Sequence, residues 1–116
     1  MVELIESYDF GRISINGVVY ERDVIVTGDK IIAGWIRKEG HLLQVADIRQ
    51  AVEECAPEVA IVGTGYDGMM SVPEKTRLYL QRKGIKLLVQ KTREACDLFN
   101  ALSKNRRTLA ALHLTC

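Results

Sequence analysis

A glycine-rich stretch near the middle of the chain has the residue types best suited to binding a ligand. It spells G-x-G-x-x-G over residues 63–68 and follows an apolar run over residues 58–63. In dinucleotide-binding proteins the helix opens within these glycines, so that its N-terminus faces the pyrophosphate. Here Pro73 predicts that the helix begins several residues later, and residues 90–93, after the next strand, include no acid to bind a ribose. We therefore expect neither a dinucleotide nor any other cofactor.

Although a dinucleotide is not expected, this glycine loop, residues 63–68, could bind a small anion. A glycine turn at the carboxyl end of a parallel strand can present free N–H groups, and the following helix adds its N-terminal dipole. The competing interpretation is a turn that only reverses the chain, and the sequence leaves both open. The candidate ligand-binding residues are five loop positions together with an amide and a cation expected nearby: Gly63, Thr64, Gly65, Tyr66, Asp67, Asn100 and Arg106.

No other spacing points to a catalytic or metal-binding group. His113 stands three residues before Cys116, but a catalytic thiol also needs a third group that orients the histidine. His41 and His113 are not at helical spacing, and the three cysteines form no C-x-x-C pair. We predict no catalytic residues and no metal ligands. Whether the protein is an enzyme stays open, but the sequence favours a non-enzymatic protein.

The charge is unevenly distributed along the chain. The net charge is only +1, yet residues 1–58 hold 11 acids and 6 bases, whereas residues 59–116 hold 4 acids and 10 bases. Either the two halves pack so that their fields cancel, or a basic face receives an anionic partner. Nucleic acid is not expected, because duplex binders usually carry a higher net charge and a recognisable motif.

The first 36 residues predict strands. Asn16-Gly17 tolerates positive φ at both turn positions and predicts a hairpin between residues 12–15 and 18–20. Two further apolar runs, at residues 23–27 and 31–36, predict strands joined by a short turn. We expect these N-terminal hairpins to lie on or beside a main sheet.

The second half predicts a β-α-β-α-β unit. Four consecutive apolar residues within 58–63 indicate a strand buried on both faces of a parallel sheet. A helix precedes this strand, with Asp47 as its N-cap, and two more follow it, one with Pro73 at its first position and one capped by Thr92. Strands over residues 85–89 and 108–114 complete the unit, and its first two strands should be parallel with a right-handed crossover. No linker or repeat interrupts the chain, so we predict one domain over residues 1–116.

Short motifs in a fixed order extend over nearly the whole chain. They are Phe10-Gly11, Asn16-Gly17, Trp35, Gly40-His41, residues 45–52, residues 61–65, Gly84-Ile85, Thr92, Ala95, Phe99-Asn100, Leu102 and residues 112–116. In this order the sequence resembles a small α/β domain family that includes archaeal hypothetical proteins, the animal adipogenesis-associated protein and a mitochondrial complex I assembly factor. The resemblance implies a three-layer α/β fold with a mixed central sheet that contains one antiparallel strand, which we assign to residues 108–114.

The function that we predict is a non-enzymatic protein-interaction or assembly module with an unknown protein partner. One branch of the resembled family acts through protein partners in respiratory-complex assembly, but this chain shows no mitochondrial presequence. The alternative is a small-ligand or anion-binding protein, or an enzyme, that uses the glycine loop. The acidic, strand-like start over residues 1–6 differs from a signal peptide, and no apolar run is long enough for a membrane span. We expect a cytoplasmic protein with reduced cysteines and leave a homo-oligomer open.

Overall fold

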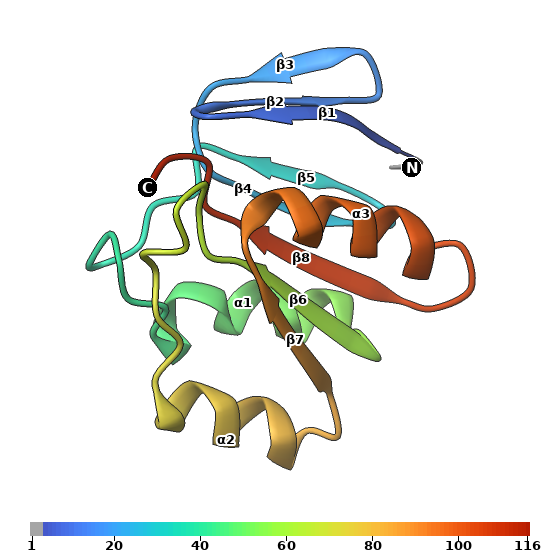
Figure 1. Cartoon of the computed structure of the whole chain (residues 1–116). Helices are drawn as coiled ribbons and strands as arrows, with labels where there is room; N and C mark the ends of the chain where they lie inside the picture. The colour runs from blue at the N-terminus through green and yellow to red at the C-terminus, as the bar shows by residue number, and fades with distance from the viewer. Residues whose placement is uncertain (1–3) are drawn as a thin grey trace.

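The computed structural model describes residues 4–116 and arranges them as two sheets and three helices (Figure 1). In chain order the elements are β1 (Ile5–Asp9), β2 (Arg12–Ile15), β3 (Val18–Tyr20), β4 (Val24–Thr27), β5 (Ile31–Ala33), α1 (Val45–Cys55), β6 (Val59–Gly63), α2 (Glu74–Arg82), β7 (Lys86–Gln90), α3 (Thr92–Leu102) and β8 (Thr108–Leu112). The predicted β-α-β-α-β unit is β6 to β8. Of the strand-like start, residues 1–3 lie outside the described residues.

The larger sheet has the strand order β5-β4-β8-β6-β7. Strands β7 and β8 both run parallel to β6, whereas β4 runs antiparallel to both β8 and β5. The sheet is therefore mixed, as predicted, but the assignment of the antiparallel strand to residues 108–114 was wrong. The helix α3 returns the chain to the end of the sheet at which β7 began, so β8 must run parallel to β7. The antiparallel position belongs to β4, which a short turn joins to β5.

Two apolar cores lie on opposite faces of this sheet. In β6, Val59 and Ile61 pack in the core beneath α3, whereas Ala60 and Val62 pack in the core beneath α1 and α2. All five residues of β6 are buried, because helices cover both faces of the sheet. Side chains that alternate between two covered faces must all be apolar, which explains the unbroken apolar run. The predicted strand over residues 58–63 is thus an interior strand, and the molecule has the expected three layers (Figure 1).

The strands β1, β2 and β3 form a separate antiparallel sheet on the α3 side. Asn16 and Gly17 have φ values of 50° and 80°, which confirms the predicted hairpin. Ile13 and Ile15 of β2 are fully buried and join the α3-side core. The N-terminal strands therefore have two different positions: the first three cover α3 and the sheet, and β4 and β5 extend the sheet itself.

The predicted helix starts were wrong by one to three residues. Asp47 is the third residue of α1 rather than its N-cap, and it accepts the backbone N–H of Gln44 in a capping box. Pro73 is the N-cap of α2, and Lys91 is the N-cap of α3. Thr92 is therefore free to point its hydroxyl away from its own helix. No helix among the described residues is long and apolar enough to cross a membrane.

Candidate functional site

The glycine loop and the last four residues leave the sheet side by side. Gly63 ends β6 and pairs with Leu112, which ends β8. The N–H groups of Tyr66 and Met69 donate to the carbonyls of Thr115 and Cys116 at 2.8 and 2.9 Å. Residues 113–116, which we call the tail, are therefore held against the glycine loop by backbone hydrogen bonds.

Two glycines permit this close approach. A Cβ atom at Gly63 would lie 2.9 Å from both the Leu112 side chain and the Thr92 hydroxyl. A Cβ atom at Gly65 would lie 2.5 Å from the Thr115 carbonyl oxygen, and Gly65 has a φ of 109°. Only glycine fits such a backbone at such a distance. These glycines therefore serve the contact between loop and tail.

Thr92 joins the loop to the tail from below. Its hydroxyl accepts the N–H of Gly65 at 2.8 Å and donates to the carbonyl of His113 at 2.6 Å. Thr92 is fully buried. Its hydroxyl thus satisfies both a donor of the loop and an acceptor of the tail.

We expect Thr92→Val to lower the free energy of unfolding by about 2 kcal/mol, because it leaves a buried N–H and a buried carbonyl without partners. Thr92→Ser keeps the hydroxyl and should cost less than about 1 kcal/mol. Urea unfolding at pH 7 measures both. A cost for Thr92→Ser as large as, or larger than, the cost for Thr92→Val would contradict a dominant role of the hydroxyl at this position.

Most backbone N–H groups from Thr64 to Met70 are engaged within the chain. The N–H groups of Thr64, Gly65, Tyr66, Met69 and Met70 donate to Gln90, Thr92, Thr115, Cys116 and Thr64 respectively. An anion at the N–H groups of Tyr66 or Met69 would have to displace the tail. The anion site at this loop stays a prediction, and this geometry does not favour it.

Two of the predicted ligand-binding residues lie apart from the loop. The amide of Asn100 accepts the N–H of Ile5 and donates to its carbonyl, both at 2.8 Å, so that it ties α3 to β1. Arg106 precedes β8, at the opposite end of the sheet from the loop. The structure brings together Gly63, Thr64, Gly65, Tyr66 and Asp67 but neither Asn100 nor Arg106.

A buried charged network, missed from the sequence, also holds the tail. Asp23 Oδ2 lies 2.8 Å from Arg37 Nη2 and 2.8 Å from His113 Nδ1, and Asp23 Oδ1 accepts the N–H of Leu114 at 2.7 Å. The Arg37 side chain is only 4% exposed. Ninety positions separate Asp23 from His113, so no spacing rule could have joined them. The nearest signal was a charged residue at the start of a β-branched run.

The charges of this network favour an ionised Asp23. Burial would raise the pKa of Asp23, but hydrogen bonds from His113, the Leu114 N–H and Arg37 together lower it below its usual value. The ionised carboxylate can only accept, so His113 donates to Asp23 when its Nδ1 carries the proton, and Arg37 Nη2, 3.0 Å from the same nitrogen, then donates to Asp23 alone. Aspartate orients a general base in this way in hydrolases, but His113 Nε2 is buried and has no hydrogen-bond partner among residues 4–116. The network therefore fastens the tail and exposes no base to a substrate.

Three exposed apolar side chains extend from segments that are bound to the tail. Phe10, Tyr66 and Met69 are 53%, 47% and 57% exposed, and we call them the apolar patch. The rings of Phe10 and Tyr66 meet edge to face at a centroid distance of 5.8 Å. Beneath them, the Tyr8 hydroxyl donates to the Leu114 carbonyl at 2.7 Å, and burial raises the pKa of Tyr8 to about 12. The patch thus stands on the turn between β1 and β2, on the glycine loop and on the residue after that loop, and each of these segments is bound to the tail.

Comparisons with known proteins place the whole chain among similar small proteins. A family model described as a protein of unknown function (DUF498/DUF598) matches residues 5–113. A conserved hypothetical protein of Pyrococcus horikoshii is 25% identical with a TM-score of 0.82, over 97% of this chain and 98% of its own. A protein of Bartonella henselae described as an outer membrane protein is 25% identical with a TM-score of 0.81, over 100% of both chains. A Mth938-like domain of Bordetella pertussis, 22% identical with a TM-score of 0.76 over 97% and 85%, shares the fold. The predicted resemblance to a small α/β family with archaeal hypothetical members is confirmed.

Proposed function

Since the chain belongs to the DUF498/DUF598 family of proteins of unknown function, we propose its role from its own geometry. It is a non-enzymatic module that binds a protein partner through the apolar patch, Phe10, Tyr66 and Met69. The observation that carries the proposal is the exposure of these three large side chains, each about half exposed, on loops that the tail holds in place.

Rigid, exposed aromatic side chains are suited to protein recognition. Tyrosine and other aromatic residues dominate the binding energy of protein interfaces, and methionine adapts to irregular partner surfaces. A preorganised surface also loses little conformational entropy on binding. Tyr66 lies on Phe10 and 6.4 Å from Tyr8, so its ring is already oriented before a partner arrives.

The charged and polar groups nearby support this reading. The amides of Gly65, Tyr66 and Met69 and the charges of Asp23 and Arg37 are engaged within the chain. An anion would have to compete with these contacts, whereas an apolar partner would leave them intact. Residues 1–116 act in this proposal as one domain in the cytoplasm, where the three cysteines, none paired with another, stay reduced.

The test compares capture from an extract of the native cells by three forms of the protein. The patch variant carries Phe10→Ser, Tyr66→Ser and Met69→Ser. The control variant carries Val18→Ser, Val19→Ser and Leu78→Ser, which remove exposed apolar side chains from other surfaces. The wild-type protein and the control should recover the same partner, and the patch variant should recover about tenfold less, because interface aromatics each contribute about 1 kcal/mol or more.

Thermal unfolding of both variants checks that each remains folded at the temperature of capture. Undiminished recovery by a folded patch variant would remove the patch from the interface. Sedimentation of the purified protein examines a second copy as the partner: in that case the wild-type protein is a dimer and the patch variant a monomer.

A further inference from the structure

The topology gathers exposed cations at the end of the molecule opposite the apolar patch. Each connection from a helix to a parallel strand lies at the amino ends of β6, β7 and β8. Six of the ten basic residues of the second half occur in or beside these connections, and all six are exposed: Arg82, Lys83, Lys86, Lys104, Arg106 and Arg107. The basic character of residues 59–116 is thus concentrated at one edge.

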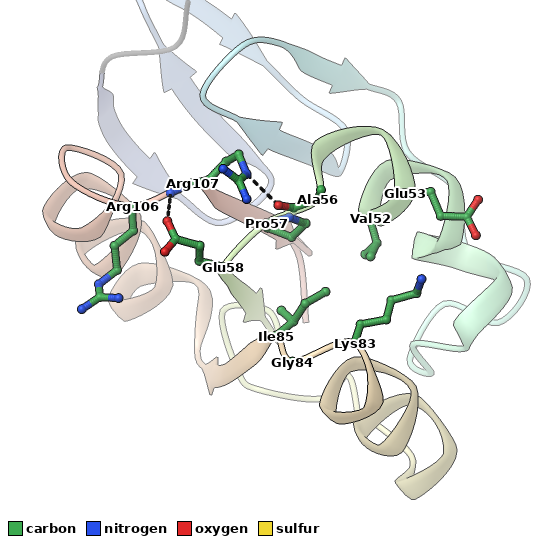
Figure 2. Close-up of a pocket in the computed structure, with 10 residues that line it drawn as sticks. All are labelled: Val52, Glu53, Ala56, Pro57, Glu58, Lys83, Gly84, Ile85, Arg106 and Arg107. Carbon is green, nitrogen blue, oxygen red and sulfur yellow. Dashed lines mark hydrogen bonds between the residues drawn. The ribbon is translucent and has the colours of Figure 1, made fainter.

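A groove of about 710 Å³ opens at this edge. Its floor is formed by Val52, Pro57 and Ile85, which are themselves buried, and in Figure 2 Arg106 and Lys83 lie on opposite sides of Ile85. Arg107 lines a third side, where its Nε donates to the Ala56 carbonyl at 2.6 Å. The groove therefore combines a narrow apolar floor with cations on its rim.

The cations at the two sides are available to a partner. Neither Lys83 nor Arg106 forms an ion pair with an acid of the described chain, although Lys83 lies over the Tyr79 ring. A ligand carboxylate would thus displace no existing ion pair. Long basic side chains can also turn toward a ligand while their stems cover apolar surface.

We propose that this groove binds an acidic peptide segment in extended form, with an apolar side chain on Ile85 and Pro57 and carboxylates toward Lys83 and Arg106. The separation of the cations suits several charges along a chain better than one compact anion. The C-terminal ends of α1 and α2 also lie at the groove, so an anion there must be held by the cationic side chains and not by free helix N–H groups.

The lining favours a peptide over a nucleic acid. Glu53 and Glu58 are among the lining residues, and their carboxylates would repel a phosphate backbone. None of the lining residues is aromatic, so unpaired bases would find no ring on which to stack. An acidic peptide can direct an apolar or neutral residue toward the two glutamates. This inference does not depend on the proposed role of the apolar patch.

The probe is a fluorescein-labelled peptide of sequence EEDLLDEE, whose binding is followed by fluorescence anisotropy at low and at moderate ionic strength. Lys83→Glu with Arg106→Glu should weaken its binding at least about tenfold at low salt, and salt should weaken wild-type binding. Arg12→Glu with Lys75→Glu changes the net charge equally at exposed sites outside the groove and should leave the affinity within about twofold.

Two further peptides and one competitor separate the alternatives. EEDSSDEE, which lacks the leucines, should bind several-fold more weakly, and KKRLLRKK should not bind. Equal losses for the groove variant and the control variant would show a diffuse charge effect and overturn the proposal. So would displacement of EEDLLDEE by an equal concentration of single-stranded oligonucleotide or of inorganic phosphate, because the groove would then be a general anion site.

Discussion

Gly65→Ala is expected to lower the free energy of unfolding by about 4 kcal/mol and to release the tail from the glycine loop. The left-handed φ of 109° costs an alanine about 1–2 kcal/mol. The new Cβ atom would also lie 2.5 Å from the Thr115 carbonyl oxygen and closer still to the backbone of Cys116, and such overpacking costs up to about 3 kcal/mol. Urea unfolding gives the total, and amide exchange at Tyr66 and Met69 reports the release of the tail.

Two other glycines separate the conformational cost from the steric cost. Gly17 has a φ of 80° and Gly28 does not have a positive φ, and in neither would an added Cβ atom meet another atom within 4 Å. Gly17→Ala should therefore cost about 1–2 kcal/mol, and Gly28→Ala less than about 0.5 kcal/mol. A Gly65→Ala variant no less stable than Gly17→Ala would show that the tail does not press against the loop.

Asp23→Asn should lower the free energy of unfolding by about 3–5 kcal/mol at neutral pH, the range measured when one partner of a buried ion pair is removed. The amide cannot accept hydrogen bonds at both positions that the two carboxylate oxygens serve. Arg37, with a side chain only 4% exposed, would lose its counter-charge, and either His113 or the Leu114 N–H would lose its acceptor. Chemical unfolding at pH 7 measures this loss.

The effect of Asp23→Asn should also depend on pH. Because folding lowers the pKa of Asp23, its carboxylate stabilises the folded state fully above its unfolded value of 3.8. This contribution is lost as the pH falls through the lower folded pKa, so the wild-type and variant stabilities should approach each other at strongly acidic pH. Asp9→Asn is the matched control, because the 3.5 Å ion pair of Asp9 with Arg93 is exposed. A constant difference between wild type and Asp23→Asn down to pH 2 would contradict this role of the carboxylate.

Most elements of the fold could be predicted from local patterns in the sequence. The hairpin at Asn16 and Gly17 follows from positive φ, and the interior position of β6 follows from its unbroken apolar residues. The direction of β8 was mispredicted, because that direction depends on the crossover through α3 rather than on any residue within the strand. Helix starts were displaced because polar residues such as Thr92 bond to other elements instead of capping their own helix.

The site was less accessible from the sequence, for a physical reason. The glycine loop is conspicuous because its residues are consecutive, but the N–H groups of Tyr66 and of nearby Met69 are satisfied by a tail that lies about fifty positions later in the chain. Asp23, Arg37 and His113 converge only after β4 and β8 have paired, and Phe10 meets Tyr66 only after the small sheet has packed. Contacts between distant segments leave no regular spacing, so a search for motifs cannot find them.

Photo-crosslinking from the apolar patch tests the central proposal most directly. One form of the protein carries p-benzoylphenylalanine in place of Phe10, and another carries it in place of Val19, which is 44% exposed on a different surface. In extract of the native cells, we expect a light-dependent adduct with one protein from position 10 and a much weaker adduct from position 19. Equal adducts from both positions, or an adduct from position 19 alone, would contradict the assignment of the binding face to Phe10, Tyr66 and Met69.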